Sequence, residues 1–259
     1  MLSIKGILQE SKTRYLQAFS NRRMPVRMKR PIISITFDDV PRTAMTNGVP
    51  ILDKFDVKAT FYVAMGLSRQ NAEDADRSEQ GGESFMGPED ILELSRSGHD
   101  ISCHTYSHYM LNTGTAQGMA LDAQRNVREL CQLLNVASID HFSYPFGQVN
   151  FKVKGLLAKN YKTMRSSRPG VNQVSTDMYL LRAMSFYSAT FDKESIKRTI
   201  EKAELSGGWL IFYTHGVTDN PDAYSCTPEQ FEWLLKQCKS SRAEILPVSE
   251  AYTTIVSNY

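Results

Sequence analysis

The 259-residue chain lacks the features that mark several large classes of protein. Its four cysteines form no CxxC pair and no regular spacing, which argues against a disulfide framework and favours reduced thiols. The formal net charge is only +2, so the strong basic excess typical of nucleic-acid-binding domains is missing and we expect no nucleic-acid partner. Internal repeats and low-complexity tracts are absent as well, which argues against repeat and disordered architectures.

Long apolar runs are also missing near the start of the chain. Leu2, Ile4, Ile7 and Leu8 are interrupted by polar residues and by Gly6, so no segment has the length of a signal peptide or a membrane span. We therefore expect a cytoplasmic protein. Hydrophobic residues make up 41% and charged residues 22% of the chain, which is typical of a globular domain, and α/β barrels of this length form one domain.

The first 30 residues differ from the rest in charge. They hold eight lysines and arginines against the single acid Glu10, which is +7 locally and leaves −5 for the remainder. We expect a basic N-terminal arm over residues 1–30 and a catalytic domain over residues 31–259. Two interpretations stay open: the arm binds an anionic inner leaflet peripherally, or Tyr15, Leu16 and Phe19 pack on the domain and the charges are solvated.

One apolar, β-branched run ends in two adjacent carboxylates: residues 32–39 read Ile-Ile-Ser-Ile-Thr-Phe-Asp-Asp. Such a run is typical of a strand buried on both faces of a parallel sheet. Because Asp38 and Asp39 repel one another, we expect compensation by a metal cation, an arginine or solvent. The simpler alternative is that one aspartate caps the next helix and the other is solvated.

Two histidines follow the next short apolar stretch. His104 and His108 are four residues apart, so a helical turn there would bring both imidazoles to one face, close enough to bind one ion. With a carboxylate from another strand end they would form a 2-His-1-carboxylate site with open positions for water and substrate. His99 precedes the strand, and we interpret it as a structural histidine.

The rest of the chain alternates between strand and helix patterns. Residues 68–84 are polar, and we expect a loop that is either a solvated insertion or a lid over the site. The expected strands are residues 59–63, 99–102, 141–144, 161–164, 180–184 and 209–214. The expected helices are residues 50–55, 88–97, 120–134, a segment capped by Asp192 and a segment capped by Thr227. Residues 243–248 are expected to give a closing strand and a short terminal helix.

Four motifs, taken in order, resemble one enzyme family. They are Thr36-Phe37-Asp38-Asp39, His104-Thr105-Tyr106-Ser107-His108, Tyr144-Pro145-Phe146-Gly147 and Tyr213-Thr214-His215. Together they resemble the polysaccharide deacetylases of the NodB-like, carbohydrate esterase family 4 type over about residues 31–250. The resemblance implies an α/β fold, a single distorted (β/α)-barrel of seven strands.

The resemblance also implies residue roles. Asp39, His104 and His108 match the metal ligands, and the expected cofactor is one divalent transition metal ion, zinc first, with cobalt, nickel or iron as alternatives. Asp38 matches the general base, His215 the general acid and the backbone N–H of Phe146 the oxyanion donor. Tyr144 and Pro145 are the expected substrate-binding residues.

Two positions depart from the family pattern. Ser143 stands where the family often has an arginine that orients and charge-stabilises the base, and Val40 stands where a glycine often follows the aspartates. We expect Arg182 to replace the missing arginine, with Arg165 as the second choice.

Three functions remain in competition. The first is a metal-dependent deacetylase, a hydrolase of carbon–nitrogen bonds other than peptide bonds, that removes an N-acetyl or similar small acyl group from an amino sugar or saccharide biosynthetic intermediate. The second is an amide hydrolase acting on a non-sugar small molecule with the same scaffold. The third is a saccharide-binding pseudoenzyme, which the missing arginine favours. The sequence does not indicate the oligomeric state.

Overall fold

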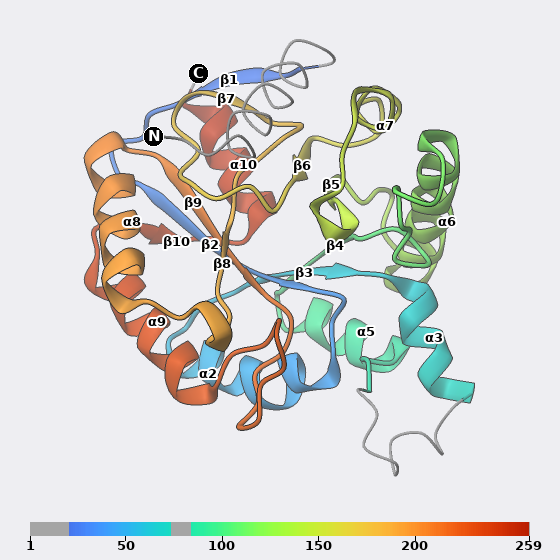
Figure 1. Cartoon of the computed structure of the whole chain (residues 1–259), viewed down its shortest axis with the longest axis horizontal. Helices are drawn as coiled ribbons and strands as arrows, with labels where there is room; N and C mark the ends of the chain where they lie inside the picture. Colours follow the sequence, from blue (N-terminus) through green and yellow to red (C-terminus); the bar gives the residue numbers. More distant parts are fainter. Residues whose placement is uncertain (1–20, 74–83, 259) are drawn as a thin grey trace.

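A parallel sheet is the centre of the fold. The computed structural model describes residues 21–73 and 84–258 (Figure 1). Seven strands lie in the order β6-β5-β4-β3-β2-β9-β8, and an eighth, β10, pairs with the start of β2; all these pairings are parallel. The strands are β2 (Ile32–Asp38), β3 (Thr60–Val63), β4 (Asp100–Cys103), β5 (His141–Ser143), β6 (Thr163–Arg165), β8 (Met184–Ser185), β9 (Trp209–Thr214) and β10 (Glu244–Ile245).

The sheet curls until its two edges approach each other. Arg165 at the end of β6 forms a parallel bridge with Leu181, three residues before β8, and the Leu181 N–H donates to the carbonyl of Met164 at 2.9 Å. The expected seven-stranded barrel is thus confirmed as a curled, seven-stranded parallel half-barrel. Because the strands are parallel, their carboxyl ends lie at one end of this barrel.

Alternation along the central strands separates the inside of the barrel from its outside. Ile32 of β2 and Trp209 of β9 belong to a cluster inside the barrel, whereas Ile33 and Leu210 belong to the larger cluster formed with the surrounding helices. Side chains of a strand point alternately to opposite faces. Asp38 therefore continues the inward series of β2, which includes Ser34 and Thr36.

Helices cover the outside of the sheet (Figure 1). Apolar stripes on these helices pack against the outward-facing strand residues. Their N-termini use the expected caps: Asp192 accepts from the N–H groups of Glu194 and Ser195, and Thr227 forms a capping box with Gln230. The helices on the outside are α2 (Val49–Lys54), α3 (Met65–Glu73), α5 (Pro88–Arg96), α6 (Ala116–Leu134), α7 (Phe151–Leu157), α8 (Lys193–Ser206) and α9 (Pro228–Ser240). Helix α10 (Val248–Ser257) instead packs its buried residues into the inner cluster.

A two-stranded antiparallel ribbon lies near α10 (Figure 1). Strand β1 (Arg23–Val26) pairs with β7 (Val174–Asp177), and Val26 is buried in the inner cluster together with residues of α10. Part of the proposed basic arm is therefore joined to the domain by backbone pairing. Residues 1–20, where Tyr15, Leu16 and Phe19 lie, are outside the described residues.

Several local expectations were wrong or incomplete. The expected strand over residues 180–184 is present only as β8, Met184–Ser185. Residues 65–73 form α3, and Ser68 is buried, so the expected polar loop does not begin at residue 68; residues 74–83 lie outside the described part. Strands β1 and β7 and helices α3 and α7 were not predicted. Within residues 21–73 and 84–258, no helix is both long and apolar enough to cross a bilayer.

Candidate active site

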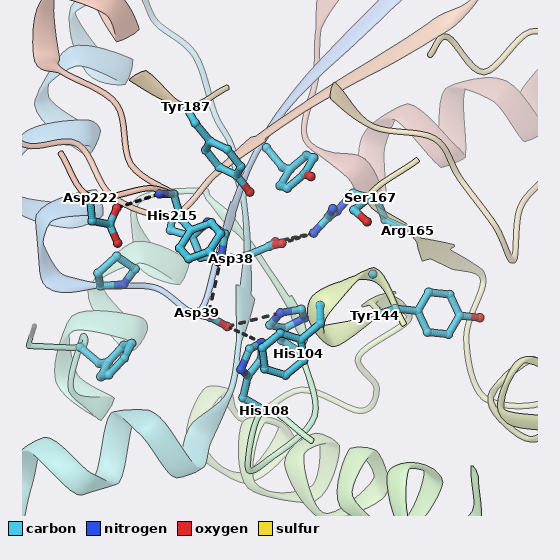
Figure 2. A pocket seen from close by; sticks show the side chains of 16 residues that line it. Asp38, Asp39, His104, His108, Tyr144, Arg165, Ser167, Tyr187, His215 and Asp222 are labelled. Carbon is cyan, nitrogen blue, oxygen red and sulfur yellow. Dashed lines mark hydrogen bonds and ion pairs between the residues drawn. The ribbon is translucent and has the colours of Figure 1, made fainter. Parts of the chain in front are cut away.

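A cavity of about 350 Å³ opens at the carboxyl ends of the strands (Figure 2). It collects side chains from seven separate segments, most of which the parallel topology brings together. Among the described residues, its lining comprises Asp38, Asp39, Pro41, Phe85, His104, His108, Tyr144, Phe146, Gly147, Arg165, Ser167, Tyr187, Tyr213, His215, Asp222 and Tyr224.

The two adjacent aspartates are separated by a sharp turn. Asp38 is the last residue of β2, while Asp39 and Val40 have φ of 58° and 55°. Left-handed backbone is uncommon for non-glycine residues and unusual for a β-branched valine, which agrees with the glycine expected at this position in the family. Asp38 and Asp39 make different contacts (Figure 2): Asp38 contacts Arg165, and Asp39 contacts three histidines.

Asp39, His104 and His108 form a compact set of potential metal ligands. Asp39 Oδ1 lies 3.3 Å from Nε2 of His104 and 3.3 Å from Nε2 of His108, and all three potential ligand atoms lie within 4.8 Å of one another. The two imidazoles converge as expected, but the helical turn that was expected to bring them together is not present. Residues 104–108 are not helical; Thr105 and His108 have φ of 63° and 51°, and this bend brings the rings together.

Hydrogen bonding prepares His104 as a ligand. Its Nδ1 lies 2.8 Å from the carbonyl oxygen of Ser143, which accepts, so Nδ1 carries the proton and Nε2 presents its lone pair toward Asp39. Burial lowers the pKa of His104 to about 3 and that of His108 to about 4, so both imidazoles are neutral near pH 7. Two neutral imidazoles and a carboxylate fit a divalent transition metal ion.

Asp38 is paired with a buried arginine. One guanidinium nitrogen of Arg165, Nη2, donates to the Asp38 carboxylate and to the hydroxyl of Ser143. The guanidinium lies over the rings of Tyr62 and Tyr213, at 5.1 Å and 4.7 Å. Burial alone would raise the pKa of Asp38, but the charge of Arg165, its hydrogen bond to the carboxylate and the nearby imidazoles of His104 and His215 together outweigh burial and hold that pKa below its usual value.

The choice of Arg182 as replacement arginine was wrong. Its Nη1 donates to the carbonyl of Pro169 at 2.9 Å, outside the set of cavity-lining residues. Arg165, the second choice, contacts Asp38 because β5 and β6 pair with Ser143 opposite Arg165. The small Ser143 side chain leaves room for the guanidinium, so an arginine from the neighbouring strand reaches the carboxylate that a residue at position 143 would otherwise contact.

His215 follows β9 and lies on the opposite side of Asp39 from the other two histidines (Figure 2). Its Nε2 is 3.6 Å from Asp39 Oδ2, and its backbone N–H donates to the Tyr224 carbonyl at 3.1 Å. Burial lowers the pKa of His215, whereas the carboxylates of Asp38 and Asp222 act in the opposite direction. Its expected role as an acid stays a prediction.

The Tyr144-Pro145-Phe146-Gly147 motif divides into buried and exposed parts. Phe146 has φ of 56° and a ring that is 51% exposed and 4.3 Å from the ring of His108. Tyr144 borders the cavity, but its buried side chain points away from the aspartates (Figure 2) and its hydroxyl donates to the carbonyl of Tyr179. Pro145 is buried and is not among the described residues that line the cavity. Substrate binding by these two residues stays a prediction.

Several lining residues were missed. Tyr187 and Tyr213 lie beside Arg165, and Asp222 and Tyr224 come from the segment after His215. Tyr213 belongs to a motif already identified, and its alternation with Thr214 on a predicted strand was a usable signal. The other three lie in irregular segments, where no periodicity indicates direction.

Comparisons with known proteins agree with this geometry. The family model described as polysaccharide deacetylase matches residues 26–164, slightly more than half of the chain. A chitin deacetylase from Colletotrichum lindemuthianum is 27% identical over 115 residues, which cover 44% of this chain and 42% of that protein. The match thus spans less than half of the length of this relative.

Solved structures share the fold. A protein from Mycobacterium smegmatis described as a candidate polysaccharide deacetylase superposes with a TM-score of 0.60 at 15% identity, covering 92% of this chain and 96% of that one. A CE4 family pseudoenzyme from Bacillus anthracis gives a TM-score of 0.57 at 13% identity, covering 86% and 66%. At these identities the likeness concerns the fold alone.

Proposed function

The chain belongs to the polysaccharide deacetylase family, and from this premise we propose that it is a metal-dependent hydrolase that removes an N-acetyl or similar small acyl group from an amino sugar or saccharide. The observation that supports the proposal most strongly is that two adjacent carboxylates make different contacts. Asp39 lies with His104 and His108, whereas Asp38 is held ionised by Arg165. An ion and a separate base are the two parts that amide hydrolysis requires.

Asp39, His104 and His108 are the residues that would bind the ion. When bound, a divalent transition metal would supply Lewis-acid chemistry, which acidifies water and polarises a carbonyl. The donor set suits zinc, cobalt, nickel and iron, of which we propose zinc.

Asp38 is the proposed general base. As the water oxygen bonds to the amide carbon, the Asp38 carboxylate accepts the proton that the water loses. Arg165 keeps this carboxylate ionised and fixes its orientation through its hydrogen bond and through Ser143. A base that is buried without such a partner would take up a proton before the reaction began.

His215 is the proposed general acid. The bond between the carbonyl carbon and nitrogen breaks as His215 gives a proton to the departing amine, so acetate and a free amino group result. Its position on the far side of Asp39 from His104 and His108 places it apart from the proposed ligand pair. The backbone N–H of Phe146 is the proposed donor to the developing oxyanion.

An acetate-release assay tests the proposal. The substrates are N-acetylglucosamine oligosaccharides of one to six units and non-sugar N-acetyl amides, each with and without a chelator. We expect acetate from the saccharides, loss of release with chelator and recovery on adding metal back. Acetate from the non-sugar amides alone would favour the second hypothesis, and saccharide binding with no release from the metal-loaded protein would favour a pseudoenzyme.

A further inference from the structure

The segment of residues 215–227, here called the β9–α9 loop, folds back on itself beside the cavity. The backbone N–H of His215 donates to the Tyr224 carbonyl at 3.1 Å, and the Cys226 N–H donates to the Gly216 carbonyl at 3.1 Å. Val217 and Cys226 also form a parallel bridge. These contacts fix the returning half of the loop against the residue that follows β9.

The backbone of Tyr224 is fixed by hydrogen bonds of this loop, while the residue is exposed to solvent. The residue is 57% exposed, yet its backbone N–H donates to Asp222 Oδ1 at 2.9 Å and its carbonyl accepts from the His215 N–H. The ring centroid lies 5.4 Å from that of His215 and 5.8 Å from that of Tyr187, the latter nearly edge-on. A large ring that is both fixed and exposed at a cavity mouth is a feature of binding surfaces.

The chemistry of the reaction places the sugar near this ring. The nitrogen that receives a proton from His215 belongs to the sugar, whereas the carbonyl carbon belongs to the acyl group. The sugar ring must therefore lie on the His215 side of the cavity. Tyr224 is the exposed aromatic lining residue in contact with His215, while Phe146 contacts His108 on the other side.

We propose that Tyr224 is the stacking platform for the sugar ring that carries the amide, and that it makes the enzyme select saccharides over small acyl compounds. The C–H groups on one face of a hexosamine would pack on the phenol ring, and Asp222, which also lines the cavity, positions the platform through its backbone hydrogen bond. This inference rests on the proposed function.

Kinetics of matched variants test the platform. Tyr224→Leu keeps an apolar side chain but removes the ring, Tyr224→Phe keeps the ring, and Leu205→Ala changes a residue of α8 that is 88% exposed and outside the site. The substrates are N-acetylglucosamine tetramer and 4-nitrophenyl acetate. We expect Tyr224→Leu to raise KM for the tetramer roughly 3- to 10-fold with kcat little changed. It should raise KM for 4-nitrophenyl acetate by a clearly smaller factor than KM for the tetramer. Tyr224→Phe should lie closer to the parent than Tyr224→Leu does, and Leu205→Ala should equal the parent.

A binding measurement separates this inference from the proposed function. Calorimetric titration of N-acetylglucosamine tetramer into the Asp38→Asn protein, with and without Tyr224→Leu, needs no turnover. If removal of the ring weakens binding several-fold, the platform is supported. This holds even if the parent protein releases no acetate, because absent release by the parent refutes only the proposed function. Equal affinity in both proteins, or no binding in either, overturns the platform. An equal rise in KM for both substrates would also overturn it, because the ring would then not select for sugar.

Discussion

Replacing Arg165 by methionine would remove the cation that faces Asp38 inside the barrel. The arginine is 1% exposed and the aspartate 5% exposed, so water does not replace the lost partner. Breaking a buried ion pair by removing one member costs about 3–5 kcal/mol, because a buried charge is left uncompensated. We therefore expect the free energy of unfolding of the metal-free Arg165→Met protein to fall by that amount at pH 7.

The effect should depend on pH with a defined sign. In the parent protein the pKa of Asp38 is held below its usual value, so its contribution to stability is present at neutral pH and is lost as pH falls through that lowered pKa. In the variant, burial acts without Arg165 and raises the pKa, so protonation relieves the buried charge as pH falls. The stability difference between the two proteins should thus be largest at pH 7 and smaller at pH 4.5.

Urea unfolding in the presence of a chelator measures both quantities. Arg182→Met is the control, since its guanidinium bonds only a partly exposed carbonyl among the described contacts, and we expect a loss within about 1 kcal/mol. The double variant Ser143→Arg with Arg165→Ser returns the arginine to the neighbouring strand and should recover part of the loss. A loss below about 1 kcal/mol for Arg165→Met at pH 7, or an equal loss at both pH values, would refute this reasoning.

Three further predictions concern other parts of the chain. Burial lowers the pKa of His141 to about 4. Between pH 4 and 6.5 the folded protein therefore binds fewer protons than the unfolded one, and its free energy of unfolding falls as pH falls. In urea unfolding, His141→Asn should reduce this fall by up to about 3 kcal/mol, and an unchanged pH profile would contradict this. Replacing residues 74–83 by a short Gly-Ser linker should alter the ratio of activity on long and short oligosaccharides more than the melting temperature, whereas equal losses on all substrates that track stability would favour a solvated insertion. Deleting residues 1–20, and not the β1 strand beyond them, removes three of the eight basic residues together with Glu10, a net charge of +2. The truncated protein should stay folded and bind phosphatidylserine vesicles more weakly at low salt, by about 1 kcal/mol for each net charge removed. If the full chain does not bind such vesicles, the peripheral membrane contact is refuted and only the cytoplasmic localisation that we propose remains.

Much of the site could be predicted because it lies at strand ends. The apolar run before Asp38 and the strand before His215 are long and buried, and parallel strands deliver their following residues to one end of a barrel. The pair His104 and His108 converged as expected although the helix expected there is absent. Two residues four positions apart can lie close together in a tight turn as well as in a helix. The prediction that the two histidines converge was therefore right although the predicted helical backbone was wrong.

What could not be predicted depends on register and on irregular backbone. Arg165 follows one predicted strand and Arg182 lies within another, and only the pairing of Ser143 with Arg165 decides which one reaches Asp38. The position of Tyr224 depends on loop hydrogen bonds that have no signature in composition or periodicity. The direction of the Tyr144 side chain could not be predicted for a related reason: its motif marks the turn, but the side chain points into the core, where its hydroxyl donates to the carbonyl of Tyr179.

The central claim is that one bound metal ion and a separate base make this chain a deacetylase. Its most direct test is a titration of zinc into the chelated protein, with metal content and acetate release from N-acetylglucosamine oligosaccharides measured at each step. We predict that release rises to a plateau at one zinc per chain, that His104→Ala abolishes both binding and release, and that Asp38→Asn binds zinc equally well without releasing acetate. Unchanged zinc binding in His104→Ala, or undiminished acetate release by Asp38→Asn, would contradict the account.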